Sequence, residues 1–369
     1  MSHPLLSAVC CASALALSAT LAWADGHAPS GLPVEVIAEF TDIRPANLTV
    51  TPQGRLIASM HPLDNAPIRM VEVTRSGEHI PFPTLDWADG PEIGLVGFSQ
   101  NVAVDTASDG IWWTLDMGRE LQGPQLVAWD TVNNALHKRI PLPNDSYLPI
   151  SFLQDMALDE TRNKIYIADM TFTLDPADAR PSIVVVDLDT GAARRAMEGD
   201  KSFMPELDEI VIDGQTVAAA DGNGNAVPLL LGLNPITIDP EDEWVYYGGV
   251  NGKNVWRIKA ADLASDMSDE DMSAKVEWYG PKSASDGIKV DGAGNVYISD
   301  IENHAIGVTT PGSYEIVAQD DVLLNWIDGL AIGPDGGVYG TQNNLHKNPA
   351  LNAGKDESTR PFRIVKIQP

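Results

Sequence analysis

The chain has 369 residues with 52 acidic and 24 basic side chains, which gives a formal net charge of −28. This acidity argues against nucleic-acid binding, because neutralising phosphates requires clustered Lys and Arg, and against docking on an anionic membrane surface. Hydrophobic residues make up 44% and charged residues 21% of the chain. That is an ordinary globular mixture and differs from that of a disordered chain.

The N-terminal segment has the composition of a targeting signal. Residues 5–24 are apolar or small and end in Ala22-Trp23-Ala24, which is typical of a secretory signal cleaved before Asp25. Both cysteines, Cys10 and Cys11, lie in this segment. We therefore expect a secreted or periplasmic protein whose mature chain has no disulfide, thiolate metal site or iron–sulfur cluster. A membrane anchor or a lipidated cysteine is a weaker alternative.

Six copies of one pattern follow, each a short alternating run, a turn and a second β-rich run. Each pair of runs predicts two antiparallel strands, and about four strands in a repeat of this length are typical of a propeller blade. We therefore predict an all-β fold, a six-bladed β-propeller with a central channel, in which one terminal strand completes the blade of the other terminus. The copies begin at Ala46, Gln100, Gln154, Asn234, Asp286 and Asp328.

The domain organisation follows from the same repeats. No interior stretch has the composition of a linker, so we predict a signal peptide over residues 1–24 and a single propeller domain over residues 25–369. The clearest helical segment is 260–275, which is rich in acidic side chains. We expect it to be a solvated excursion between two blades.

The first residues of the repeats are expected to ring one mouth of the channel. Their carboxylate and amide oxygens suit a hard divalent cation, although Asp and Asn before a strand also commonly bond their own backbone in a turn. We predict a metal site at Asn234, Asp286 and Asp328. The residues predicted to bind a small ligand are Gln100, Asn101, Gln154, Asp155 and Trp326.

Five segments in order carry a family resemblance. They are Pro81-Phe-Pro-Thr-Leu-Asp-Trp87, Asp105 to Gly118, Gly123 to Asp130, Asn303-His-Ala-Ile-Gly and Leu324-Asn-Trp-Ile-Asp-Gly-Leu. Together they resemble the Yellow / major royal jelly protein family across nearly all of the mature sequence. The resemblance implies a propeller that binds a small molecule; some relatives bind amines, and others are associated with dopachrome conversion in pigment formation. Insect members carry cysteines where Ala107 and Val308 stand here, which suits a bacterial exported homologue.

A second resemblance concerns two of the repeat starts. Asn234, before Pro-Ile-Thr-Ile-Asp-Pro, and Asp286, before Gly-Ile-Lys-Val-Asp, are similar to metal ligands of the SMP-30/gluconolactonase propellers. This implies a lactonase in which Ca²⁺, Mg²⁺, Mn²⁺ or Zn²⁺ polarises the lactone carbonyl and Asp286 acts as the catalytic base. The family's ligand Glu falls at Ala46, which cannot coordinate, so the match is partial.

Three functions therefore stay open: a Yellow-type propeller that binds a small organic molecule, with dopachrome-converting activity as one form; a metal-dependent lactone hydrolase; and a non-catalytic propeller that binds a partner. An enzyme would be a lactonase-like hydrolase or a dopachrome tautomerase-like isomerase. The chain has no Walker A loop, nucleophile elbow or dinucleotide fingerprint. We expect no nucleotide, haem or iron–sulfur cofactor, no nucleic-acid partner, no membrane association after signal cleavage, and a monomer.

The first testable prediction concerns export. Because the Ala-x-Ala pattern ends at Ala24, N-terminal sequencing of the protein recovered from the periplasm or the medium should begin at Asp25. A chain that keeps Met1 in that fraction would contradict the prediction.

Overall fold

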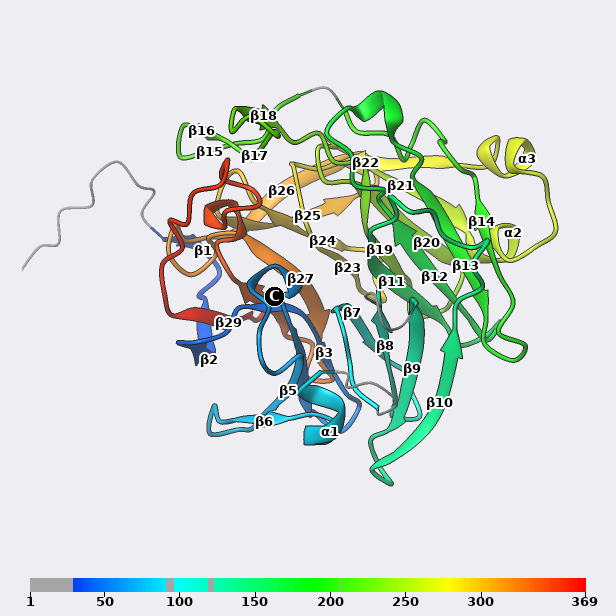
Figure 1. The fold of residues 1–369 in the computed structure, drawn as a ribbon, viewed down its shortest axis with the longest axis horizontal. Coiled ribbons are helices and arrows are strands. Elements are labelled where there is room, and N and C mark those ends of the chain that lie inside the picture. The colour runs from blue at the N-terminus through cyan, green and yellow to red at the C-terminus, as the bar shows by residue number, and fades with distance from the viewer. Residues whose placement is uncertain (1–28, 91–95, 119–122, 207) are drawn as a thin grey trace, which may run out of the picture.

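The structure, a computed structural model, describes residues 29–90, 96–118, 123–206 and 208–369. Six antiparallel sheets of four or five strands stand around a central channel (Figure 1). Their innermost strands contact one another in a closed ring. The predicted six-bladed β-propeller is thus confirmed.

Blades 1 to 5 are meanders of consecutive strands, and the first strand of each repeat lies innermost in its blade. Blade 1 consists of β3 (Pro45–Val50), β4 (Leu56–Met60), β5 (Met70–Val73) and β6 (His79–Pro81). Blade 2 consists of β7 (Asn101–Thr106), β8 (Ile111–Asp116), β9 (Gln125–Asp130) and β10 (Ala135–Pro141). Blade 3 consists of β11 (Leu153–Asp159), β12 (Lys164–Asp169), β13 (Ser182–Asp187) and β14 (Ala193–Ala196). Blade 4 consists of β19 (Leu233–Ile238), β20 (Trp244–Gly249), β21 (Asn254–Lys259) and β22 (Glu277–Pro281). Blade 5 consists of β23 (Ile288–Val290), β24 (Val296–Asp300), β25 (Ala305–Thr310) and β26 (Ser313–Gln319), and β1 (Ser30–Gly31) pairs with β26 at its edge.

Blade 6 closes the ring with strands from both ends of the chain. It contains β27 (Ile327–Ile332), β28 (Val338–Gln342) and β29 (Phe362–Ile367), and its outer strand is β2 (Glu35–Phe40), which pairs antiparallel with β29. This is the predicted exchange of a terminal strand. It closes the ring of blades, because β2 and β29 lie in one sheet.

The second repeat begins at another residue than the one predicted from the sequence. In blade 3, Leu153 lies opposite the end of the second strand and Gln154 follows it; in blade 2 the corresponding residue is Asn101. Val102 therefore occupies the place of Gln154, and the prediction that Gln100 begins this repeat is wrong by two residues. The error arose because the aspartate that ends the pattern lies inside β7 in blade 2 but at the end of β11 in blade 3.

Short elements fill the connections. The long spacing between the third and fourth repeats is due to two hairpins, β15 (Val211–Ile212) with β16 (Gln215–Thr216) and β17 (Ala218–Ala220) with β18 (Ala226–Pro228). Another helix, α1, and three 3₁₀ turns lie elsewhere in the described residues. They are α1 (Leu85–Ala88), η1 (Pro62–Asp64), η2 (Pro176–Asp178) and η3 (Leu345–Lys347).

The predicted helix over 260–275 is two short helices, α2 (Ala260–Leu263) and α3 (Asp269–Ser273). It connects β21 to β22 inside blade 4, so its placement between two blades was wrong. The Ser268 side chain accepts the Asp271 N–H at 3.2 Å and restarts the helix as its N-cap. The segment is also anchored, because Leu263 and Met272 are buried against the core.

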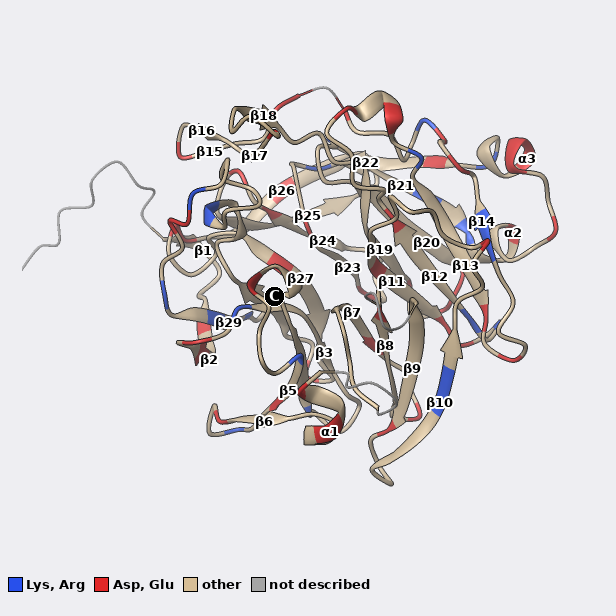
Figure 2. Ribbon diagram, viewed as in Figure 1, with Lys and Arg blue, Asp and Glu red and all other residues tan. Residues whose placement is uncertain are grey.

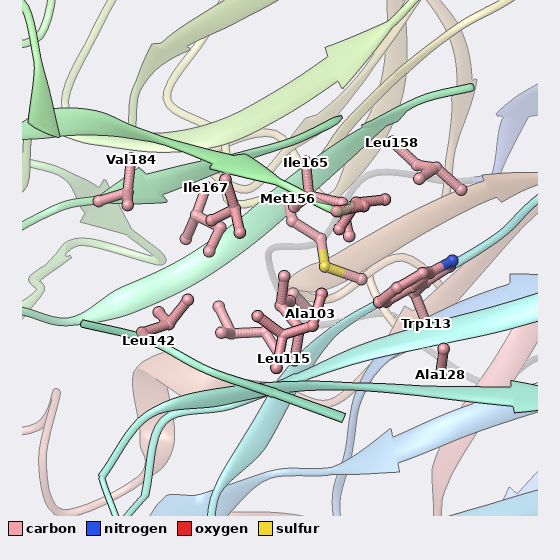
Figure 3. Packing of buried hydrophobic residues seen from close by; sticks show 14 of the residues in the cluster. Ala103, Trp113, Leu115, Ala128, Leu142, Met156, Leu158, Ile165, Ile167 and Val184 are labelled. Atoms are coloured by element: carbon pink, nitrogen blue, oxygen red, sulfur yellow. The ribbon is translucent and has the colours of Figure 1, made fainter. Parts of the chain in front are cut away.

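The core lies between neighbouring blades. Residues that alternate along the strands of blades 2 and 3 meet face to face, with Trp113 and Leu115 on one side and Met156 and Ile167 on the other (Figure 3). Blade packing of this kind follows from period-2 patterning, which gives each sheet two apolar faces when it is covered on both sides. Acidic residues are distributed over many blades and are dense on α3 (Figure 2), so the negative charge belongs to the whole surface.

The channel is narrowed at mid-depth by Asp155. Its carboxylate accepts the Asn47 side-chain N–H at 3.1 Å and the Met156 backbone N–H at 2.9 Å, and it faces a void of only ≈ 10 Å³. Burial raises the pKa of Asp155 to about 7, against the opposing effect of the backbone hydrogen bonds. A carboxyl group whose pKa is higher folded than unfolded lowers stability as the pH rises through that interval.

The second prediction therefore concerns Asp155→Asn. At pH 8 the variant should be more stable than the wild type, by on the order of 1–4 kcal/mol, because it removes a buried charge. Near pH 4, where both folded proteins carry a neutral group at this position, the gain should vanish. Urea unfolding at pH 4, 6 and 8 measures this, and a stability difference that does not change with pH would contradict it.

The third prediction concerns ring closure. Phe40 in β2 is fully buried, whereas Val36 in the same strand is 40% exposed. Phe40→Ala should lower the free energy of unfolding by about 3–5 kcal/mol, and Val36→Ala, the matched control, should change it by less than about 0.5 kcal/mol. Equal effects of the two substitutions in denaturant titrations would show that β2 does not contribute to the core as described.

Candidate functional site

A cavity lies where the inner strands begin, at one mouth of the channel. It has a volume of ≈ 510 Å³ and receives Gln154 from blade 3, Asn234 from blade 4 and Asp286 from blade 5. Most of its wall is apolar. The apolar lining comprises Leu63, Phe152, Met170, Phe172, Leu174, Ala219, Ala220, Leu229, Leu231, Val250, Leu345, Pro349, Ala350 and Leu351.

Two insertions form part of this wall. The hairpin β17–β18 follows blade 3, and the segment 345–351 connects β28 to β29 in blade 6. They are joined by backbone hydrogen bonds, from the Ala218 N–H to the Leu351 carbonyl at 3.0 Å and from the Ala353 N–H to the Ala218 carbonyl at 2.7 Å. Segments far apart in the sequence therefore cover the mouth together; we call them the roof.

Asp286 is the best-positioned charged group in the cavity wall. One carboxylate oxygen accepts the Asn234 side-chain N–H at 2.6 Å, and the other accepts the indole N–H of Trp326 at 2.8 Å. Its backbone N–H is held by the Ser299 hydroxyl at 3.1 Å. Burial raises the pKa of Asp286 to about 6, while the hydrogen bonds from Trp326 and Asn234 favour the ionised form. At pH values above about 6, the cavity therefore holds a carboxylate of fixed orientation.

Asp328 and His61 form a second polar group beside Asp286. The Asp328 carboxylate accepts the Asn343 side-chain N–H at 2.7 Å and lies 3.7 Å from Nε2 of His61. Burial, and then the charge of Asp286, raise the pKa of Asp328 well above its usual value. Burial lowers the pKa of His61 to about 3. Because Nδ1 of His61 accepts the Leu63 N–H at 3.2 Å, the ring is neutral with its proton on Nε2, toward Asp328.

Two buried oxygens at the mouth receive no hydrogen bond from the described residues. They are Oε1 of Gln154 and Oδ1 of Asn234, whose side chains are 6% and 2% exposed. An unsatisfied buried acceptor costs about 1–3 kcal/mol, so such atoms in a cavity indicate where a bound molecule would donate hydrogen bonds. Together with the Asp286 carboxylate, the polar part of the site consists mainly of acceptors.

The predicted metal ligands come together but are already engaged. Asn234, Asp286 and Asp328 begin neighbouring inner strands, yet both oxygens of Asp286 and one of Asp328 accept N–H groups of the protein. Within the described residues, no group of three or more His, Cys, Asp or Glu side chains is placed to hold a metal ion. As arranged, these residues do not fit a divalent-cation centre, and cation binding stays a prediction.

The predicted ligand residues separate into two groups. Gln154 and Trp326 line the cavity. Asp155 lies deeper in the channel, and Asn101 is fully buried with its side-chain N–H bonded to the Thr114 hydroxyl at 3.0 Å. Gln100 precedes β7, away from the mouth-facing register position held by Val102. The ligand-binding roles of all five stay predictions, but only the first two share a cavity.

Sequence reasoning missed the apolar wall. Phe152 and Met170 flank strands of blade 3, and Leu229 and Leu231 follow the hairpins. The one available signal was the 80-residue interval between the repeats at Gln154 and Asn234, which showed that an insertion was present. It could not show that the insertion folds back over the channel.

The opposite mouth is chemically different. It contains a cavity of ≈ 300 Å³ whose lining includes five acidic side chains and one cation, Lys289. Nζ of Lys289 lies 3.3 Å from a carboxylate oxygen of Asp105. Asp155 and its small void separate it from the apolar cavity.

Among the described residues, no helix has the length and apolar character needed to span a membrane.

Solved structures of similar architecture cover nearly the whole chain. A gluconolactonase from Xanthomonas campestris matches with a TM-score of 0.54 and 11% identity, over 94% of this chain and 96% of that one. A calcium-binding regucalcin from Agrobacterium tumefaciens matches with a TM-score of 0.51 and 15% identity, over 92% and 93%. A luciferin-regenerating enzyme matches with a TM-score of 0.54 and 13% identity, over 92% of this chain and 96% of that one. At these identities the likeness shows the fold alone.

The sequence itself gives a more specific result. A search of curated proteins found no match to the chain. The family model described as major royal jelly protein matches residues 101–368, which is well over half of the 369 residues. The resemblance predicted from the five ordered segments is therefore confirmed, and the chain belongs to the major royal jelly protein family.

Proposed function

We propose that this protein binds a small organic molecule at the roofed mouth of its channel, and that the molecule has an apolar body and a cationic, hydrogen-bond-donating head. The observation that carries the proposal is a single fixed carboxylate, Asp286, in the mostly apolar wall of a cavity of ≈ 510 Å³. A volume of this order is typical of small-molecule sites.

The apolar body is supported by the wall. Aromatic and aliphatic side chains such as Phe152, Leu231 and Leu351 face the cavity from the blades and the roof. Phe172 and Leu174 at its edge are 42% and 43% exposed. Covering such surface with an apolar ligand yields about 25 cal/mol for each Å² removed from water, which favours a ligand with a hydrophobic body.

The head group is supported by the acceptors. Asp286 is held by Trp326 and Asn234, and the free oxygens of Gln154 and Asn234 lie in the same part of the site. A protonated amine satisfies such a set, because an ammonium group has three donors and no acceptor. A carboxylate ligand would instead face the negative charge of Asp286 at neutral pH.

The family resemblance adds a reaction and a location to this proposal. Export through the predicted signal would place the protein in the periplasm or outside the cell, and a dopachrome-type amine derivative would fit the proposed head and body. Asp286 would then be positioned to remove a proton from the bound molecule. Both carboxylate oxygens of Asp286 already accept hydrogen bonds from the protein, which suits this residue better to a proton-removing role than to metal coordination.

The lactonase alternative rests on Asn234 and Asp286, whose sequence surroundings resemble those of metal ligands in the SMP-30/gluconolactonase propellers. Oδ1 of Asn234 has no partner in the described part of the chain, so this oxygen is available to an ion. For a metal ion to bind there, Asp286 must lose one of its hydrogen bonds, from Asn234 or from Trp326, and use that oxygen to coordinate the ion. A partner-binding role without catalysis remains the third hypothesis, and a functional small-molecule site would not by itself exclude it.

The fourth prediction tests the ligand class with three probes that share one apolar body: 2-phenylethylamine, 2-phenylethanol and phenylacetate. Calorimetric titration at pH 7.5 should rank the amine first and the carboxylate last. Asp286→Asn should weaken amine binding roughly tenfold or more, since a hydrogen bond to a charged group is worth about 1.5–3 kcal/mol. The alcohol should lose less.

Asp105→Asn, at the opposite mouth, is the matched control and should leave amine binding unchanged. Equal binding of the three probes, or equal effects of the two substitutions, would contradict the proposal. Titration of Ca²⁺, Mg²⁺, Mn²⁺ and Zn²⁺ into metal-free wild type and Asp286→Ala is the test of the alternative. Tight binding by the wild type alone, with turnover of a lactone, would favour the hydrolase.

A further inference from the structure

Two histidines outside the cavity have buried ring nitrogens that nothing in the described protein satisfies. His304, just before β25, is 3% exposed, and His346, in η3, is 8% exposed. Both nitrogens of His346 and Nδ1 of His304 lack a hydrogen-bond partner. Buried polar atoms are almost always paired, so unpaired nitrogens on two neighbouring rings point to something that binds between them.

The hydrogen bond on the far side of His304 prepares it as a ligand. Its Nε2 lies 2.9 Å from a carboxylate oxygen of Asp213, in the turn between β15 and β16. A carboxylate at this position keeps the proton on Nε2 and leaves the lone pair on Nδ1 exposed to the interior. Histidines that bind metals commonly have this arrangement, because the carboxylate fixes the tautomer and raises the basicity of the binding nitrogen.

His346 is held in place by Trp326. The two rings are stacked with centroids 5.7 Å apart and planes 16° apart. Burial lowers the pKa of His346 to about 3, so its ring is neutral and keeps a nitrogen lone pair at neutral pH. The His304 and His346 centroids are 6.4 Å apart. An ion bound to one nitrogen of each ring, at about 2 Å from each, spans a separation of this size.

We propose that His304 and His346 form a binding site for a monovalent copper ion at the joint between the β15–β16 hairpin and blades 5 and 6. Two imidazole nitrogens satisfy Cu⁺, a soft ion that accepts two ligands. Zn²⁺ and other divalent ions that favour imidazole require four or more ligands. Ile212, Ile301 and Leu345, which lie within three residues of Asp213, His304 and His346 in the sequence, belong to one apolar core cluster.

The ion has a route to the site. Asp213 is 57% exposed, so the outer side of the joint reaches solvent. The hairpin is joined to blade 5 there by the Asp213–His304 pair and by a hydrogen bond from the Val211 N–H to Glu302 at 3.2 Å. Copper would therefore add a link between this hairpin and the ring. It would also stand behind Trp326, the residue that orients Asp286.

The fifth prediction tests this site by anaerobic titration of Cu⁺ in competition with bicinchoninate. His3 and His27, which lie outside the described residues, are replaced by Ala in every protein. One Cu⁺ should bind per chain, and X-ray absorption should show two nitrogen neighbours. Asp213→Asn should weaken binding about 10–100-fold, the usual effect of losing the carboxylate partner of a metal-bound histidine.

A matched pair separates ligation from packing. His346→Leu and His346→Met have similar side-chain volumes, but only the methionine thioether is a ligand for Cu⁺. The leucine variant should lose the ion and the methionine variant should keep it, with circular dichroism showing that both fold. The exposed His137→Ala is the control and should bind as the parent does. No Cu⁺ binding, equal binding by the leucine variant, or tighter binding of Zn²⁺ would overturn the proposal and leave a buried water as the bridging group.

Discussion

The structure depends on the pairing of β2 with β29, because this pairing closes the ring of blades. Each blade has two apolar faces and buries them against its neighbours, so an open ring would expose the faces of two blades. No disulfide can perform this closure, since both cysteines precede residue 25. Closure therefore rests on backbone hydrogen bonds and on buried side chains such as Phe40, Phe362 and Ile364.

Closure also determines the chemistry of the mouth. Inner strands that begin at equivalent register positions bring one side chain from each blade to the axis, and this is how Gln154, Asn234 and Asp286 meet although they are separated by 80 and 52 residues. Their rigid strands keep unsatisfied oxygens and a buried carboxylate in place at a cost in stability. Such a cost is tolerated where a site requires fixed groups.

The six blades, their order and the exchange of a terminal strand could be predicted, because period-2 patterning and repeat spacing are local properties of a sequence. The repeat at Gln100 could not be aligned, since an aspartate inside a strand and one at its end look alike without the hydrogen-bond register. Asn234, Asp286 and Asp328 were correctly brought together. Their N–H partners were not predictable, because Trp326 and Asn343 reach them from loops whose course depends on tertiary packing.

Trp326 links the cavity to the histidine pair, because it contacts both Asp286 and His346. Its indole N–H orients Asp286, one ring face stacks on His346, and its backbone has φ +53°, which is strained for a bulky residue. Such a conformation persists only where several contacts determine it together. A change at His346 that shifts the stacked ring therefore also shifts the donor to Asp286. Copper bound behind Trp326 would reduce that freedom, and the carboxylate that faces the ligand would gain a more rigid support.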